Sequence, residues 1–182
     1  MSDHNCTFAT IFSFDSMVNL FLGLGGNVGN VSEKFKIALD EIVKNIGRVI
    51  AKSSIYKTEP WGNKNQGFFL NQVVEVETTL AAENALKRTL EIERLLGRNR
   101  DKNNQFAART IDIDILFYGN EIIGGADLVI PHPRLHLRNF VLTPLFEIAP
   151  EFLHPSLNRK IKDLIKDNPD KSDVKIFEKI SG

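Results

Sequence analysis

Residues 68–96 have the sequence FFLNQVVEVETTLAAENALKRTLEIERLL. The first part, residues 68–80, is rich in Val, Phe and Thr and predicts a long strand. Residues 81–96 carry apolar side chains at helical spacing and predict an amphipathic helix, which Gly97 ends. A long strand followed directly by a helix is one unit of an alternating pattern. The segments on either side show whether that pattern continues and so decide the fold.

The same order of elements recurs on both sides of this stretch. Residues 18–24 predict a strand, Asn30 and Glu33 resemble a capping box that starts a helix, and residues 49–56 predict another strand. Downstream, residues 110–118 alternate as a strand. Two helices between four strands, with a hairpin between the central strands, predict an α+β ferredoxin-like sandwich with a mostly antiparallel sheet and helices on its faces.

The chain beyond residue 118 predicts further elements. Residues 128–130 favour a strand, and residues 131–137 favour a loop because they contain two prolines. Residues 139–149 and 158–166 favour helices, and residues 174–180 favour a last strand. No linker divides the chain, so residues 17–182 are expected to form a single domain.

The composition excludes several classes of protein. The chain has 182 residues, 42% of them hydrophobic, with 23 basic and 23 acidic side chains. The balanced charge provides no field for nucleic acid or membrane, and no apolar run approaches the ~20 residues that span a bilayer. The single cysteine, Cys6, is compatible with a reducing cytoplasm. Residues 1–16 are expected to be a disordered or dispensable extension, because Met17 directly precedes the first convincing strand.

Two acidic residues in the strand at 110–118 are the clearest candidates for a metal site. Residues i and i+2 of a strand point to one face, so Asp112 and Asp114 are expected to project together. Magnesium prefers hard oxygen ligands and usually takes one or two carboxylates together with substrate phosphates. The alternative is an acidic face exposed to solvent, and the spacing alone favours that alternative.

Arginines flank the acid pair. Arg109 adjoins it, and Arg98 and Arg100 lie upstream in a polar loop. Guanidinium groups beside paired carboxylates suit a metal-bound polyphosphate, although solvated loop charges would produce the same pattern. Glu93 lies on or beside the apolar stripe of its helix, where a carboxylate needs a partner, and an arginine of the following loop is the candidate.

Two further segments have features of binding sites. Strand alternation places Phe69 and Asn71 on one face, where a ring and an amide suit a flat heterocycle with its own amide edge. A core Phe and a turn-adjacent Asn are the alternative that spacing favours. The glycine-rich residues 23–29 lack the Lys-Ser/Thr of a phosphate-binding loop, so a tight strand-to-helix turn is expected there.

Taken together, the motifs resemble the family of 6-hydroxymethyl-7,8-dihydropterin pyrophosphokinases of the folate pathway. The resemblance runs from about residue 18 to residue 151. It rests on GGN at 25–27, SSIYKTEPWG at 53–62, FLN at 69–71, ERLLGR at 93–98, RTIDIDIL at 109–116, PHPRLH at 131–136 and FVLTPLFEIAP at 140–150. Their common order and spacing make chance agreement hard to sustain.

The resemblance implies a transfer of diphosphate from ATP to the hydroxymethyl group of a reduced pterin, with release of AMP. It implies that two magnesium ions are held by Asp112 and Asp114. It implies that the pterin is bound by Thr58, Trp61, Phe69, Asn71 and Phe140. It implies that Arg109, His132 and Arg138 bind ATP. It also implies that Arg98 and Arg100 belong to a mobile loop that closes over the reacting groups.

Two other functions remain open at this point. Ferredoxin-like sheets with two strand carboxylates also serve metal-dependent nucleotidyltransferases, which release pyrophosphate instead of AMP. A catalytically weak protein that binds a pterin or a nucleotide is the second alternative. The expected assembly is a monomer, with a dimer as the alternative.

Overall fold

The computed structural model describes residues 17–59, 67–98 and 110–179. The strands of its main sheet are β1 (Val18–Gly26), β2 (Arg48–Lys52), β3 (Ile55–Thr58), β4 (Phe69–Thr78), β5 (Asp112–Tyr118) and β10 (Val174–Glu178). Two short hairpins are formed by β6 (Ile123–Gly124) with β7 (Val129–Ile130) and by β8 (Leu153–His154) with β9 (Arg159–Lys160). The helices are α1 (Val31–Asn45), α2 (Ala82–Leu95), a 3₁₀ turn (Leu135–Leu137), α3 (Asn139–Ile148) and α4 (Ile161–Lys166).

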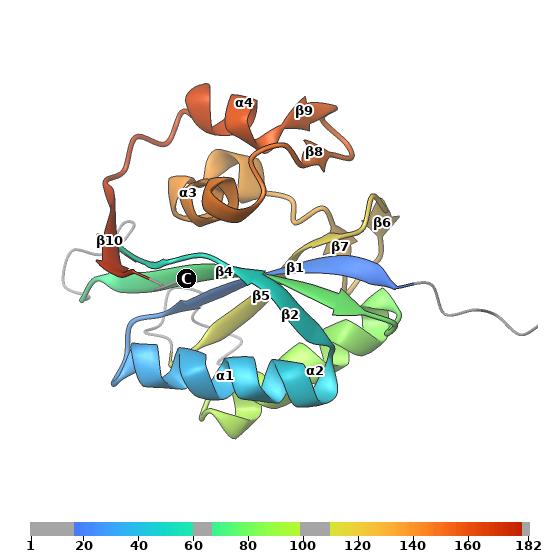
Figure 1. The fold of residues 1–182 in the computed structure, drawn as a ribbon, viewed down its shortest axis with the longest axis vertical. Helices are drawn as coiled ribbons and strands as arrows, with labels where there is room; N and C mark the ends of the chain where they lie inside the picture. Colours follow the sequence, from blue (N-terminus) through green and yellow to red (C-terminus); the bar gives the residue numbers. More distant parts are fainter. Residues whose placement is uncertain (1–16, 60–66, 99–109, 180–182) are drawn as a thin grey trace, which may run out of the picture.

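The main sheet is antiparallel and lies between two layers of helices. Its strand order is β10-β3-β4-β1-β5, and β2 pairs with β4. In Figure 1, α1 and α2 cover the lower face of the sheet, and α3 and α4 lie above it. This order and the two crossover helices confirm the predicted ferredoxin-like sandwich. The layer that contains α3 and α4 comes from the C-terminal part of the chain.

Each face of the sheet buries its own hydrophobic core. One core joins the sheet to α1 and α2 and contains Leu22, Phe35, Val74 and Ile113. The other joins it to α3 and α4 and contains Phe21, Val73 and Leu142, among others. Because successive residues of a strand point to opposite faces, membership of a core shows which way each strand residue points. None of the helices in the described ranges is both long enough and apolar enough to cross a membrane.

The start of α1 confirms the predicted cap. The Asn30 side-chain oxygen accepts the Glu33 backbone N–H at 3.3 Å, and this bond satisfies one of the donors that a helix start leaves unpaired. The Gly47 N–H donates to the Ile42 carbonyl at 3.1 Å as the helix ends. The sequence therefore sets both ends of this helix.

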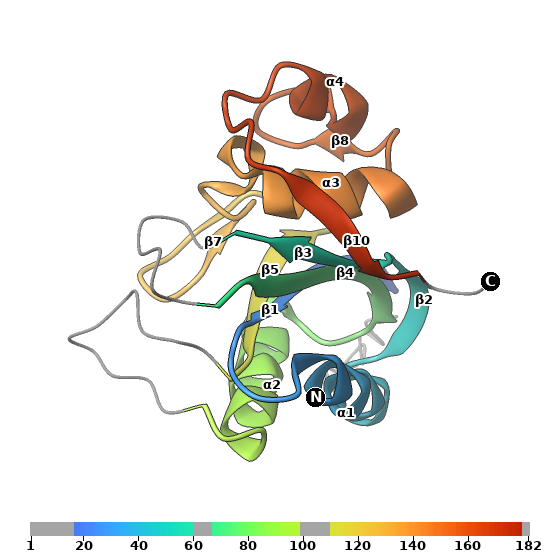
Figure 2. The same cartoon turned by 90° about the vertical axis from the view of Figure 1, so that its left-hand side faces the viewer.

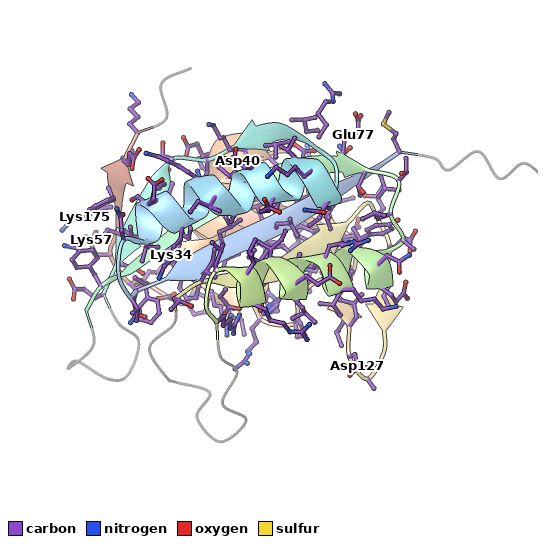
Figure 3. The ribbon with its side chains drawn as sticks, turned by 90° about the horizontal axis from the view of Figure 1, so that it is seen from below. Lys34, Asp40, Lys57, Glu77, Asp127 and Lys175 are labelled. Atoms are coloured by element: carbon purple, nitrogen blue, oxygen red, sulfur yellow. The ribbon has the colours of Figure 1, made fainter. Side chains whose placement is uncertain are left out.

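Gly47 is also a site of close backbone approach. A Cβ added there would lie 2.2 Å from the Glu77 carbonyl oxygen of β4, and Figure 3 shows Glu77 at the end of the sheet where α1 finishes. We expect Gly47→Ala to lower the free energy of unfolding by about 3 kcal/mol, because backbone must move to admit the methyl group. Urea denaturation measures the loss. The control is Gly124→Ala, where a Cβ would meet nothing within 4 Å; equal midpoints for the two variants would contradict the prediction.

Two local predictions are wrong. The single strand expected over residues 49–56 is two strands, β2 and β3, because Ser53 and Ser54 between them are buried and hydrogen-bonded. The Ser53 hydroxyl accepts the Val73 N–H at 3.0 Å and donates to the Ser54 carbonyl at 2.8 Å. Gly25 and Gly26, expected in a strand-to-helix turn, belong to β1 instead.

Candidate active site

The candidate site lies on the face of the sheet that α3 covers. Val73 of β4 belongs to the core beneath α3, so alternation places Phe69 and Asn71 on the same face. Ile113 and Ile115 of β5, and Ile111 directly before it, belong to the opposite core, which leaves Asp112 and Asp114 on the face toward α3. The predicted sharing of one face is therefore confirmed for both pairs.

The strand registers bring these two pairs into one row. Gly25 of β1 pairs with Asp112 on one side and with Asn71 on the other, and Asn71 in turn pairs with Tyr56 of β3. Neighbouring strands are ~4.8 Å apart, so the Asp112 and Asn71 backbones are roughly 10 Å apart. That separation suits a phosphate group and a heterocycle bound side by side.

Gly25 forms the floor between the two ends of the row. A Cβ at Gly25 would have its nearest neighbour at 3.5 Å, the Asn71 side-chain oxygen, so a larger side chain would project over the row. Two glycines at i and i+2, Gly23 and Gly25, leave this face of β1 without side chains beside the acid pair. The sequence interpretation missed this role, although the i, i+2 spacing of glycines in a strand is the signal that could have revealed it.

The acid pair is joined to α2 by a buried ion-pair chain. The Arg98 guanidinium donates to both Glu93 and Asp112 through the same nitrogen, Nη1. Glu93 is 1% exposed, and its carboxylate also accepts the Ile113 N–H at 2.8 Å. The expectation that an arginine of the following loop pairs with Glu93 is confirmed. The contacts of Arg98 and the hydrogen bond from Ile113 to Glu93 together fix the segment of β5 on which Asp112 and Asp114 lie.

The charge of Arg98 is secured by its neighbours. Burial alone would lower its pKa, but Asp112 and Glu93 outweigh burial and raise the pKa of Arg98 above its ordinary value. Asp112 is 9% exposed and Asp114 is half-buried. A fixed positive charge therefore neutralises part of the acidic cluster and holds Asp112 in place.

The donor set of this cluster fits magnesium. Asp112 and Asp114 present hard carboxylate oxygens on one face of β5, as magnesium requires. Within the described ranges no group of three or more His, Cys, Asp or Glu side chains could enclose a metal ion. Two carboxylates leave coordination positions for phosphate oxygens and water, which matches the usual way in which proteins bind magnesium together with a nucleotide.

The opposite end of the row presents polar and aromatic groups. The Asn71 amide nitrogen donates to the Thr58 hydroxyl at 3.0 Å, and both residues are buried. Phe69, the first residue of β4, is half-buried and pairs with Thr58 across the strands. The hydrogen bond to Thr58 orients the Asn71 amide, so its carbonyl oxygen and remaining N–H have a defined direction.

The start of α3 supplies the remaining described residues. Arg138 is the N-cap residue of α3, and its guanidinium lies 5.6 Å from the centroid of the Phe140 ring. Burial, followed by the charges of Arg138 and Arg134, lowers the pKa of His132 to about 4. His132 is therefore uncharged near neutral pH, and it can offer a phosphate or a ribose a hydrogen bond but no positive charge.

The end of α3 is tied to the strand beside Asn71. The Glu147 carboxylate accepts hydrogen bonds from the Ser54 N–H at 2.8 Å, the Ser54 hydroxyl at 2.9 Å and the Tyr56 hydroxyl at 2.9 Å. Burial, strengthened by the bond to Glu147, raises the pKa of Tyr56 to about 12. Because Tyr56 pairs with Asn71, this contact joins α3 to the row itself. No local motif predicts it, since the partners are 91 to 93 residues apart.

Three predicted site residues, Trp61, Arg100 and Arg109, lie outside the described residues. The structure brings Asp112, Asp114, Asn71, Phe69 and Thr58 to one face of the sheet, with Arg98 bound to Asp112. Arg138 and Phe140 lie on the helix that covers this face, and the His132 N–H donates to the Leu116 carbonyl of β5 at 3.0 Å.

Comparisons with known proteins agree with this geometry. The model of the family described as 7,8-dihydro-6-hydroxymethylpterin-pyrophosphokinase matches residues 21–150. The chain belongs to this pyrophosphokinase family. The match covers every described residue of the row from Asp112 to Tyr56 and the whole of α3, and it ends before β8. Residues 151–182 of this pyrophosphokinase-family chain therefore lie beyond the matched part.

Individual relatives support the family. Three proteins named 2-amino-4-hydroxy-6-hydroxymethyldihydropteridine pyrophosphokinase are similar to the chain. The one from Methylorubrum extorquens is 39% identical over 75% of this chain and 86% of its own length. Those from Aquifex aeolicus and Haemophilus influenzae are 34% and 36% identical, over 84% and 88% of this chain and 93% and 99% of their own lengths.

Solved structures support the fold. The Plasmodium falciparum HPPK-DHPS wild-type protein, crystallised with pteroate, superposes with a TM-score of 0.69 at 18% identity. The superposition covers 83% of the pyrophosphokinase-family chain but only 44% of the Plasmodium chain. At this identity the likeness concerns the fold alone.

Proposed function

We propose that this chain transfers a diphosphate group from ATP to the hydroxymethyl oxygen of 6-hydroxymethyl-7,8-dihydropterin, a reaction of folate biosynthesis. The products are the pterin diphosphate and AMP. The observation that carries the proposal is the row from Asp112 across Gly25 to Asn71, which puts an acid pair and a side-chain amide on one face of the sheet. Membership of the pyrophosphokinase family supports the choice of substrates.

The reaction requires positioning and charge neutralisation more than a strong base. The pterin hydroxymethyl oxygen attacks the β-phosphorus of ATP, the bond from that phosphorus to the α-phosphate oxygen breaks, and AMP leaves. Phosphoryl transfers of this kind are accelerated mainly by alignment and by electrostatic stabilisation of the transferred group. The proposal therefore assigns the residues of the site to holding the two substrates in line.

Asp112 and Asp114 are proposed to hold two magnesium ions. The bound ions would neutralise the polyphosphate and orient it. Arg98 is proposed to keep Asp112 oriented and, with Arg100 and Arg109, to balance the negative charge of the transferred group. His132 and Arg138 are proposed to contact the phosphates or ribose of ATP, with His132 acting as a neutral hydrogen-bonding group.

Phe69 and Phe140 are proposed to stack on the two faces of the pterin, and Asn71 to read its amide edge. Thr58 supports Asn71 through the 3.0 Å hydrogen bond, and with Trp61 it is proposed to complete the pocket. The stacking residues come from different layers, β4 of the sheet and the first turn of α3. Pterin binding would thus depend on how firmly α3 is held over the sheet.

Stacking on Phe69 makes a measurable prediction. We expect Phe69→Ala to raise the KM for the pterin roughly 5- to 150-fold, because stacking of a base on an aromatic ring contributes about 1–3 kcal/mol. The neighbouring Phe68→Ala is the matched control. The Phe68 ring is 41% exposed and lies beneath the Lys57 ammonium and near Phe177, at the edge where Figure 3 shows Lys57 beside Lys175. Equal KM values for the two variants would show that Phe69 does not contact the pterin.

The function itself is tested by product analysis. The full chain is incubated with ATP, magnesium and the reduced pterin, and the products are identified by mass. AMP together with pterin diphosphate is the expected pair. Release of pyrophosphate would support a nucleotidyltransferase instead, and binding without turnover would support a catalytically weak binding protein.

The setting of the reaction follows from the same proposal. We place it in the cytoplasm, where ATP and a reduced pterin are available, and the single cysteine agrees with a reducing compartment. The partners are these two small molecules, without nucleic acid or membrane, and the proposed assembly is a monomer, with a dimer as the alternative. Residues 17–182 are proposed to act as one domain.

A further inference from the structure

The first turn of α3 is held by a distant part of the chain. Its N-cap residue, Arg138, makes no capping bond with its side chain, and the turn contains no acidic residue. Instead, the Asn139 backbone N–H donates to the Asp170 carboxylate at 2.8 Å. The Asn139 side-chain amide donates to the Ser172 carbonyl, also at 2.8 Å. Asp170, 31 residues downstream, thus accepts a backbone N–H at the helix start, as an N-cap side chain does.

Asp170 is itself fixed within a short segment, residues 168–173, which we call the C-terminal strap. Its second carboxylate oxygen accepts the Ser172 N–H at 2.9 Å, and its own N–H donates to the buried Asn168 side chain at 3.1 Å. Partial burial would raise the pKa of Asp170, but the N–H groups of Asn139 and Ser172 lower it. The carboxylate therefore stays charged, as a helix N-terminus favours.

The strap joins α3 to the strand that carries Thr58. It leads directly into β10, whose first residue, Val174, pairs with Thr58 of β3. Figure 2 shows β10 running along β3 beneath α3, with the strap rising from it toward the helix. The start of α3 is thereby linked to the sheet edge next to Asn71 through its hydrogen bonds to the strap and through the backbone that continues from the strap into β10.

We propose that Asp170 is a positioning residue that orients the first turn of α3, and with it Arg138 and Phe140, over the candidate site. Asn139, which donates both hydrogen bonds to the strap, lies between Arg138 and Phe140 in the sequence. The inference rests on the proposed function, in which Arg138 contacts ATP and Phe140 stacks on the pterin. The strap lies outside residues 21–150, so the family match does not include it.

The expected effect is on binding rather than on the chemical step. Without the cap, the first turn of α3 samples orientations in which Arg138 and Phe140 do not face the substrates. The measured affinity then falls in proportion to the fraction of competent molecules, whereas saturating substrate restores the competent state. KM should therefore rise while kcat changes little.

The test compares Asp170→Ala with Asp173→Ala in the full chain. Asp173 is an exposed acid of the same strap that pairs with Lys175 at 2.6 Å, so it serves as the matched control. We expect Asp170→Ala to raise the KM for the pterin and for ATP about tenfold, with kcat within about twofold of the parent, as a drop in the competent fraction to about a tenth predicts. Asp173→Ala should leave both constants unchanged. Unchanged KM values in Asp170→Ala would overturn the proposal.

A second measurement separates this proposal from the proposed function. Hydrogen exchange of the amides at 139–142 should be about tenfold faster in Asp170→Ala than in the parent, while β1 and β4 keep their protection. Asp170→Asn, which keeps one carbonyl oxygen, should fall between the two. If the parent shows no turnover but Asp170→Ala shows this faster exchange, the proposed function is contradicted and the positioning role of Asp170 stands. Unchanged exchange in an active parent would contradict the strap alone.

Discussion

Replacing Asp112 or Asp114 by alanine is expected to lower kcat by roughly 100-fold or more, the size of loss that follows removal of one preorganised charge contact. Both carboxylates project from β5 toward α3, and the described ranges contain no group of three or more His, Cys, Asp or Glu side chains that could hold a metal ion. The measurement is AMP release at saturating ATP, magnesium and pterin. Removing magnesium with a chelator should abolish the activity of the parent.

The control for this prediction is Asp127→Ala. Asp127 is an exposed acid between β6 and β7, and Figure 3 shows it away from α1 and the sheet edge of Lys57. Its loss changes the net charge by the same amount but should leave kcat unchanged. If Asp112→Ala turns over as fast as Asp127→Ala, Asp112 takes no part in the reaction and the proposed metal site is wrong.

Glu93→Ala is expected to lower the free energy of unfolding by about 3–5 kcal/mol, the usual cost of breaking a buried ion pair. The substitution removes the acceptor of the Ile113 N–H and one of the two carboxylates to which Arg98 Nη1 donates. A buried donor without a partner loses its hydration and gains nothing in return. Urea denaturation measures the loss, and kcat should fall as well, because Ile113 lies between the two metal-binding candidates.

Glu91→Ala is the control on the same helix. The Glu91 side chain is 53% exposed and pairs only at the surface with Arg88, so its loss should cost less than about 1 kcal/mol. Glu93→Gln, which keeps a carbonyl oxygen for the Ile113 N–H, should lie between the two. Similar midpoints for Glu93→Ala and Glu91→Ala would show that the ion-pair chain adds little to stability.

The fold could be predicted from sequence where local signals agree with the tertiary structure. The strand and the helix predicted over residues 68–96 correspond to β4 and α2, and the cap predicted at Asn30 begins α1. Prediction failed at Ser53 and Ser54, because side-chain hydrogen bonds to the backbone replace part of the ladder there. Alternation of apolar residues carries no information about such bonds.

The candidate site could be predicted only where its residues are close in sequence. Asp112 with Asp114, and Phe69 with Asn71, follow from strand alternation within one element. The row that joins them does not, because it depends on the registers of β1 with β4 and with β5. Asp170 and Glu147 are further cases, since each acts on a partner many residues away and matches no local motif.

The contact between Glu147 and the strand β3 has a consequence for how this chain can change over evolution. One carboxylate accepts three hydrogen bonds from two residues, so replacing Glu147 removes the acceptor of the Tyr56 hydroxyl and of both Ser54 donors. Homologues that replace Glu147 with an apolar residue should also carry a side chain without a hydroxyl at the position of Tyr56. These two positions should therefore change together, although one lies in the sheet and the other in the helix layer that packs on it.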